Sequence, residues 1–127
     1  MVGADPDDRQ REVFEIVHAA ERAGIEAARA GAPALEVDAA ARGVIEEAGY
    51  GPHFIHRTGH GLGLEVHEPP YLTATNEQPL EPGMVVTVEP GIYVEGWGGV
   101  RIEDDVVIRE GAAEVLTAAP IALEAER

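Results

Sequence analysis

The sequence has no cysteine, no serine and no lysine among its 127 residues. Without cysteine the chain can form no disulfide, no thiolate metal site and no cysteine nucleophile, and a reducing compartment suits it. Without serine and lysine it has no serine nucleophile, no Schiff-base amine and no P-loop lysine. Any chemistry must therefore use His, Asp, Glu, Thr, Tyr and Arg.

Positive charge is also scarce. Nine Lys and Arg residues stand against 24 Asp and Glu residues, which gives a formal net charge of −15 and a pI near 4.5. Such a surface repels phosphate backbones and anionic lipids, so we expect no nucleic-acid partner and no membrane association. The chain also lacks a long apolar run and a signal-peptide pattern at its start. We expect a soluble protein of the cytoplasm.

Two helical patterns occupy the first part of the chain. Apolar residues spaced three or four apart predict a helix from about residue 6 to residue 30, with Asp5 as N-cap and Pro6 at the first helical position. A second pattern from Leu35 to Ala48 predicts another helix that ends at Gly49.

From residue 52 onward, glycine and proline recur every few residues between β-branched runs. These runs predict strands at 84–88, 92–94, 100–102 and 106–108, and a last hairpin strand at 114–116. Helices followed by strands indicate an α+β fold, with two helices packed on one face of an antiparallel sheet. The length and the apolar content of 45% suit a single domain over residues 1–127.

Four of the five histidines lie close together in the sequence, at His53, His56, His60 and His67. Glycines 59, 61 and 63 surround His60 and allow the backbone to approach a ligand closely. An imidazole placed there could reach a metal ion or a substrate. The alternative is a glycine-rich turn that carries surface histidines.

Two carboxylates occur where a strand should be apolar. Glu89 ends the hydrophobic run 85–88. Glu103 lies two residues beyond Arg101, so Glu103 and Arg101 should point to the same face of their strand. A buried carboxylate is costly unless a cation neutralises it. One histidine and two glutamates suit Mn, Fe, Co or Zn in a site open to water. Alternatively, Arg101 and Glu103 form an ordinary ion pair and Glu89 simply begins a turn.

Three segments carry a family resemblance when they are taken together. They are residues 56–68 (HRTGHGLGLEVHE), 80–93 (LEPGMVVTVEPGIY) and 99–105 (GVRIEDD). In order and spacing they resemble the metallopeptidases that include Xaa-Pro aminopeptidases, prolidases and methionine aminopeptidases, and most closely the Xaa-Pro branch. The resemblance covers essentially the whole chain. It implies the carboxyl-terminal half of a pita-bread catalytic domain, with two helices on a curved antiparallel sheet.

The resemblance also implies roles for individual residues. The metal ligands would be His60, Glu89 and Glu103, with Glu103 bridging two ions and Glu89 also moving a proton. The catalytic groups would be His67, Glu89 and His56, of which the two histidines line the substrate cleft. The outer residues near substrate and ligands would be Arg101, Tyr93 and His53.

The implied reaction is hydrolysis of the bond between an amino-terminal residue and a following proline. The complete family site holds two divalent ions, here manganese first, with cobalt, iron or zinc as alternatives, and these activate the attacking water. The sequence leaves open whether the activity is that of an aminopeptidase or a dipeptidase.

The chain departs from the family pattern at one place. Family members supply two aspartate ligands from a hairpin just upstream of the first helix, and Asp5, Asp7 and Asp8 do not match them. We therefore expect an isolated chain to be inactive, and to need a complementary amino-terminal half or a second copy in a homodimer. The alternatives are a non-catalytic peptide-binding module and a truncated fragment.

Overall fold

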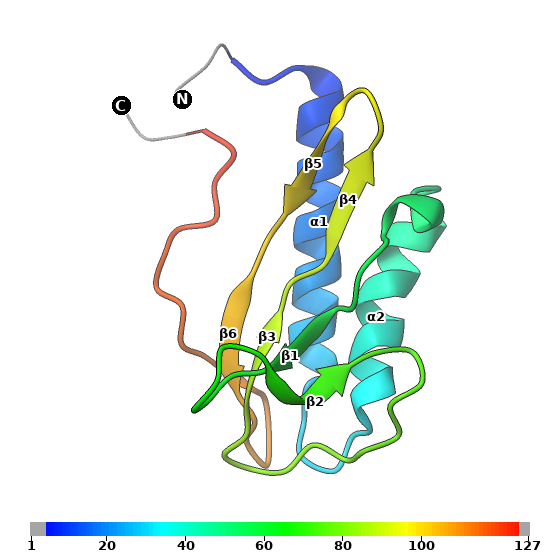
Figure 1. Ribbon diagram of the computed structural model, residues 1–127. Coiled ribbons are helices and arrows are strands. Elements are labelled where there is room, and N and C mark those ends of the chain that lie inside the picture. Colours follow the sequence, from blue (N-terminus) through cyan, green and yellow to red (C-terminus); the bar gives the residue numbers. More distant parts are fainter. Residues whose placement is uncertain (1–4, 125–127) are drawn as a thin grey trace.

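Residues 5–124 are described by the computed structural model. Within them lie α1 (Asp8–Ala27), α2 (Ala34–Glu47), a 3₁₀ turn η1 (Gly51–His53), β1 (Gly59–Gly61), β2 (Glu68–Leu72), β3 (Val85–Val88), β4 (Gly91–Val94), β5 (Gly98–Arg101), β6 (Asp104–Val107) and β7 (Glu114–Val115). Both helices lie behind the strands in Figure 1 and form one layer against them. The α+β prediction is confirmed. The single-domain prediction for 1–127 stays a prediction, and its ends at 1–4 and 125–127 lie outside the described residues.

Helix α1 is shorter than the predicted helix at both ends. Asp7, not Asp5, is the N-cap: its side chain accepts a hydrogen bond from the Gln10 amide at 2.7 Å, and the Gln10 side chain accepts one from the Asp7 amide at 2.8 Å. This reciprocal pair leaves Pro6 outside the helix. At the other end, the amides of Ala30 and Gly31 bond to carbonyls of the strand connections, so the chain leaves the helix after Ala27.

Helix α2 matches its prediction closely. It runs to Glu47, and Gly49 follows with φ of +86°, a conformation that glycine adopts without strain. The helices bury small and β-branched side chains against each other and against the sheet, among them Val13, Val17, Ala20, Val37, Ala41 and Ile45. At Gly24 an added Cβ would lie 2.8 Å from Val88 Cγ1, so glycine lets α1 sit directly on β3.

The strands form an antiparallel sheet of order β2-β1-β3-β6-β7 and a separate hairpin of β4 and β5. All five predicted strands are present, with bounds shifted by one or two residues. Strands β1 and β2 were not predicted. Strand β1 pairs with β2 on one side and with β3 on the other, so the histidine-rich segment lies inside the sheet.

The β4–β5 hairpin continues the β3–β6 pair in the same register. Val88 pairs with Asp104 before the interruption, and Gly91 pairs with Arg101 after it. The same register carried across the gap places Glu89 opposite Glu103. Figure 1 shows β4 and β5 rising as the extension of β3 and β6. The expectation that Glu103 lies within a strand is wrong, because the ladder is interrupted at the two glutamates.

Side chains alternate across this ladder, which gives its two faces different characters. Val86, Val88 and Val106 are fully buried on the helix side. Thr87, Glu89 and Arg101 occupy the other face, where the ladder is open to a cavity. In the part of the chain that the structure describes, neither helix is long and apolar enough to cross a membrane.

Candidate functional site

His60 lies in the middle of β1, and its neighbouring glycines explain how it fits there. A Cβ on Gly59 would meet the backbone of Thr87, with the carbonyl carbon at 2.8 Å, and a Cβ on Gly61 would lie 2.7 Å from the Pro69 carbonyl carbon. Glycine therefore permits β1 to run between β2 and β3. His60 itself is only 5% exposed. The glycine-rich segment is a strand, so the surface-turn alternative is wrong for His60.

The His60 ring points one nitrogen at a carboxylate. Its Nδ1 lies 2.9 Å from the Gly61 carbonyl oxygen, which can only accept, so Nδ1 carries the proton of a neutral ring. Its Nε2 lies 3.1 Å from Glu89 Oε1. In the neutral ring this contact sets a nitrogen lone pair against a carboxylate oxygen. The pair is therefore satisfied only by a cation between them, either a proton or a metal ion.

Glu89 is held firmly from two sides. Thr87 Oγ1 donates to its Oε1 at 3.0 Å, and Arg101 Nη1 lies 3.1 Å from its Oε2. Its own amide donates to the Thr58 carbonyl at 2.7 Å, and the residue is 8% exposed. Arg101 thus pairs with Glu89, and the structure gives it no ion pair with Glu103 within residues 5–124. The alternative of an Arg101–Glu103 pair is wrong.

Glu103 faces Glu89 across the interrupted ladder, at the rim of the site. Burial of its carboxyl is the largest cause of a raised pKa, and the charges of Glu89 and Asp105 raise the pKa further. Arg101 and His60 act in the opposite direction. Two carboxylates directly opposite each other repel, and a bound cation would relieve that repulsion.

Two more imidazoles border the same space. The His67 ring is exposed and lies 4.3 Å from the His60 ring between centroids. His56 Nδ1 lies 2.7 Å from the Arg57 carbonyl oxygen, so it carries the ring proton, and Nε2 is a buried lone pair without a hydrogen-bond partner. Burial lowers the pKa of His56, which keeps the ring neutral.

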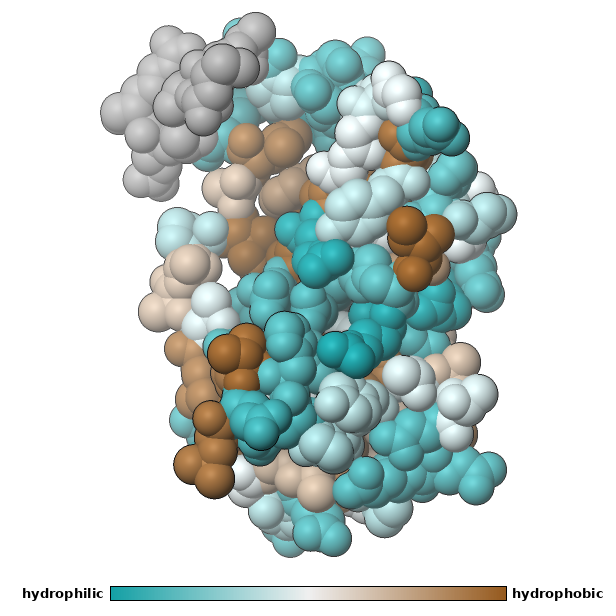
Figure 2. Space-filling view, in the orientation of Figure 1, coloured by the Kyte–Doolittle hydropathy of each residue, from teal (hydrophilic) through white to brown (hydrophobic). Residues whose placement is uncertain are grey.

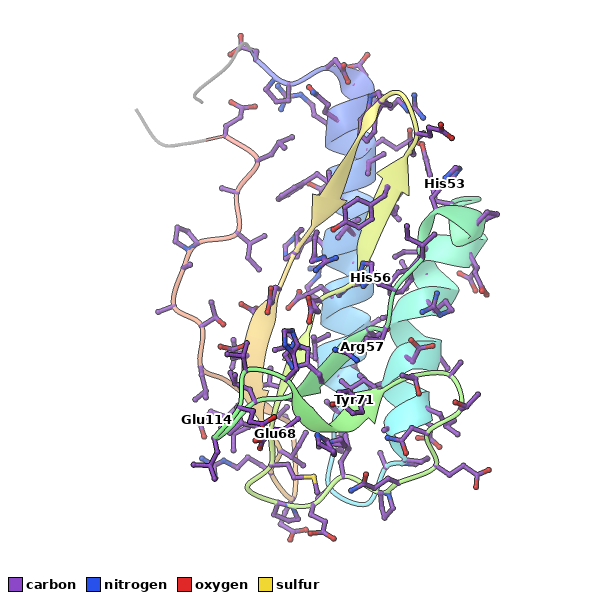
Figure 3. All side chains as sticks on the ribbon, viewed as in Figure 1. His53, His56, Arg57, Glu68, Tyr71 and Glu114 are labelled. Atoms are coloured by element: carbon purple, nitrogen blue, oxygen red, sulfur yellow. The ribbon has the colours of Figure 1, made fainter. Side chains whose placement is uncertain are left out.

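These side chains surround a cavity of about 400 Å³. It is lined by His56, Arg57, His60, His67, Glu89 and Arg101. Tyr93 stands behind the wall, with its ring 5.7 Å from that of His56 and 5.5 Å from Arg101 Cζ. His53 is not brought to the site. Its ring lies beside Tyr50 at 6.1 Å, and Figure 3 shows it near the end of α2, apart from His56 and Arg57.

The donors are close but do not form a complete metal cage. Across residues 5–124, no group of three or more His, Cys, Asp or Glu side chains is arranged to hold an ion. His60 and Glu89 are in contact, and Glu103 stands opposite Glu89. The structure therefore brings His60 and Glu89 together, whereas Glu103 lies nearby but exposed and outside the cavity lining, and the ligand roles of all three stay predictions.

A buried network that sequence reasoning missed fixes the entrance to β1. Asp38 is 1% exposed and binds Arg42 through two hydrogen bonds of 3.0 Å, and Thr58 Oγ1 donates to it at 2.8 Å. Arg42 also donates to the carbonyls of Phe54 and His56, each at 2.9 Å. The available signal was an acid and a base spaced i,i+4 on the apolar face of the second helix.

The fold is that of a metallopeptidase, and comparison with known proteins identifies the family. The model of "Metallopeptidase family M24" matches residues 1–110, and the chain belongs to that family. Its fold is half of the pita-bread fold that its structural neighbours share.

Similar proteins carry names of the Xaa-Pro type. The chain is 50% identical over 117 residues to a Xaa-Pro dipeptidase of Pyrococcus furiosus, covering 92% of this chain and 34% of that protein. The solved Xaa-Pro dipeptidase of Bacillus anthracis superposes with a TM-score of 0.93 at 48% identity, over 95% of this chain and 34% of that one. The X-Pro aminopeptidase of Thermotoga maritima gives 0.91 and 46%, over 94% and 34%. The chain spans about a third of the length of these relatives.

Proposed function

We propose that this chain supplies the metal-binding half of a Xaa-Pro exopeptidase, which hydrolyses the bond between an amino-terminal residue and a following proline. The observation that carries the proposal is the contact between His60 Nε2 and Glu89 Oε1, with Glu103 opposite in the interrupted ladder. The Xaa-Pro names of the similar proteins support the substrate class.

The donor set fits a divalent ion. His60 offers its Nε2, and Glu89 and Glu103 offer carboxylate oxygens that repel each other without a cation between them. When bound there, such an ion would polarise a carbonyl group and lower the pKa of water. We propose manganese, with cobalt, iron and zinc as ions that the same donors accept. A two-ion site needs two further aspartate ligands, which we assign to a complementary amino-terminal half.

The remaining groups have distinct parts in this proposal. Arg101 occupies Glu89 Oε2, so Oε1 is the atom that faces His60 and is placed to accept and return a proton. The exposed His67 imidazole donates a hydrogen bond to the peptide carbonyl. His56 forms part of the cavity wall, with its Nε2 buried inside that wall. Tyr93 and Arg101 hold these groups in place.

Metal uptake and peptide hydrolysis test the proposal. We expect manganese binding by calorimetry, and its loss in His60→Ala and Glu103→Ala. Hydrolysis of Ala-Pro with added manganese should be absent or very slow in the isolated chain, since two ligands of the two-ion site come from elsewhere. His18→Ala is the matched control, because His18 lies on α1 outside the site. Equal manganese binding by wild type and His60→Ala, or none by wild type, would contradict the proposal.

We propose a peptide-binding module that needs no metal as the second candidate function. The observation that favours it is the lining of the cavity of about 400 Å³, where His67 and Arg101 offer polar groups that can bind a peptide directly. Peptide binding that is equally tight in EDTA and in manganese would support this second function.

We also propose that a second copy or an amino-terminal half covers the rim of the site. Three large apolar side chains stand exposed around it or on the β1–β2 connection, Ile55 at 75%, Leu64 at 104% and Val66 at 70%. On the face shown in Figure 2, hydrophobic surface forms separate patches among hydrophilic residues. Covering such side chains is favourable, since apolar surface leaves water.

A further inference from the structure

We propose that Arg57 binds the terminal carboxylate of the substrate and thereby makes the cavity selective for dipeptides. This inference rests on the proposed function and goes beyond it, because it assigns the selection of substrate length to one residue. No role has so far been given to Arg57, although it lines the site cavity.

The first support is the position of the guanidinium group. Tyr71 pairs with His60 in the β1–β2 register, so the two side chains share one face of the sheet. Arg57 Cζ lies 4.6 Å from the centre of the Tyr71 ring. Figure 3 shows Arg57 and Tyr71 side by side, with His56 next along the chain. Stacking on the ring holds the planar guanidinium beside the site and reduces the entropy lost when it binds.

The second support is charge. Within residues 5–124, four other arginines form ion pairs with carboxylates: Arg11, Arg42, Arg101 and Arg109. Arg57 forms none among the described residues. Arg9, Arg22 and Arg29 form none there either, but of these four arginines it is Arg57 that lines the site cavity. Its planar fork of N–H donors matches the two oxygens of a carboxylate.

The third support is the place of Arg57 between two cavities. It lines the site cavity of about 400 Å³, and it also lines a neighbouring cavity of about 370 Å³ bounded by Phe54, Ile55 and Thr73. A peptide that ends at its second residue can place its carboxylate on Arg57. A longer peptide has an uncharged amide at that point, and must pass Arg57 to reach the neighbouring cavity. Arg57 therefore favours peptides of two residues over longer peptides.

Binding of three short peptides tests this inference without requiring turnover. Ala-Pro, Ala-Pro amide and Ala-Pro-Ala are titrated into the chain in EDTA and in manganese, with NMR amide shifts as the readout. Wild type should bind Ala-Pro about tenfold more tightly than its amide, as expected for one charge-assisted pair. In Arg57→Gln that preference should vanish, and Ala-Pro-Ala should bind at least as well as Ala-Pro. Arg57→Lys should restore part of the preference, because the charge returns without the fork.

Arg29→Gln is the matched control, since Arg29 is exposed just after the carboxyl-terminal end of α1 and does not line the site cavity. This substitution should leave the preference for the free carboxylate unchanged. The inference is overturned if Arg57→Gln keeps the preference for the free carboxylate, or if wild type binds no peptide or shows no preference. Failure of the proposed function gives a different result, which is absent manganese binding. The same titrations detect it whether or not the preference for the free carboxylate is present.

Discussion

At the scale of single residues, the Thr87 hydroxyl forms hydrogen bonds with both His60 and Glu89. Its hydroxyl accepts the His60 amide at 3.1 Å and donates to Glu89 Oε1 at 3.0 Å, and the residue is 2% exposed. One hydroxyl therefore fixes both the backbone of the imidazole and the direction of the carboxylate.

Thr87→Val keeps the shape of this side chain and removes both hydrogen bonds. The buried His60 amide loses its partner, so we expect the free energy of unfolding to fall by about 1–3 kcal/mol. Urea unfolding followed by circular dichroism measures the change. Thr87→Ser retains the hydroxyl and should lose less. A Thr87→Val variant as stable as wild type would show that the hydroxyl does not hold the site.

Glu103→Gln should change stability in opposite directions with and without metal. In EDTA the variant should melt at a higher temperature than wild type, since the repulsion between Glu89 and Glu103 is removed. In manganese, wild type should gain stability by mass action while Glu103→Gln gains little. Glu110→Gln, an exposed acid beyond β6, is the control for loss of charge alone. Equal gains in manganese for wild type and Glu103→Gln would remove Glu103 from the ligand set.

The site was predictable from the sequence only where residue type carries the signal. His60 and Glu89 stand out because imidazole and carboxylate are expensive to bury without a partner. Thr87 could not be singled out, since threonine is ordinary in a strand and its role depends on which strands are neighbours. His53 shows the opposite error: it belongs to the histidine cluster in sequence, but η1 holds it away from the cavity.

At the scale of elements, β1 depends on the absence of a side chain at Gly59. Gly59→Ala places a Cβ against the Thr87 backbone, which cannot move aside as a flexible side chain could. We expect a loss of more than about 2 kcal/mol, comparable to overpacking of a core. Gly43→Ala is the matched control, since nothing lies within 4 Å of its added Cβ in α2. That variant should gain about 0.5–1 kcal/mol.

Denaturant midpoints of the two glycine variants provide the measurement. If Gly59→Ala gains stability as Gly43→Ala does, β1 has room for a side chain at position 59 beside β3, which contradicts the prediction. The same packing explains why β1 and β2 escaped prediction: glycine and proline disfavour strands locally, and only contact with β3 makes glycine necessary here. The position of Glu103 outside a strand could not be predicted for a related reason, since the break in the ladder follows from pairing between distant segments.

A pair of acids connects α1 to β6. Glu21 and Asp104 are 1% and 6% exposed, and Glu21 Oε1 has no hydrogen-bond partner. The pKa of Glu21 is raised to about 8, first by burial and then by the hydrogen bond and charge of Asp104, while the charge of Arg22 acts in the opposite direction. The protonated Glu21 is thus the form that suits the fold. His18 lines the adjoining cavity together with these residues.

This pair predicts how stability varies with pH. Because the pKa of Glu21 is raised from 4.5 to about 8, the folded state binds more protons than the unfolded state between these values. The contribution of Glu21 to the free energy of unfolding is therefore most favourable below pH 4.5 and declines as pH rises to about 8. Glu21→Gln should lose this decline and be more stable than wild type at pH 8.5, by at least about 1 kcal/mol. Urea unfolding from pH 5 to 8.5 measures it, with exposed Glu26→Gln as control. Parallel pH profiles for wild type and Glu21→Gln would contradict it.

At the scale of the whole molecule, the order of the elements determined the fold class, and their pairing did not follow from the sequence. Two amphipathic helices followed by β-branched runs require a helix layer on a sheet. The placement of the histidine segment inside that sheet depended on contacts between residues far apart in the chain. The cytoplasmic location stays a prediction, as does the need for a second half.

Charge determines how a second copy could join the first. Each copy carries a net charge of −15, so two copies repel at low ionic strength, whereas exposed Leu64 and Val66 favour contact. Association should therefore strengthen from 20 mM to 500 mM salt, because screening weakens the repulsion and leaves apolar burial unaffected. Sedimentation velocity at micromolar concentration measures the shift from monomer to dimer. Leu64→Asp should reduce association at every salt concentration without changing the melting temperature, since Leu64 is fully exposed. A monomer at all salt concentrations excludes the second copy and leaves an amino-terminal half as the source of the remaining ligands.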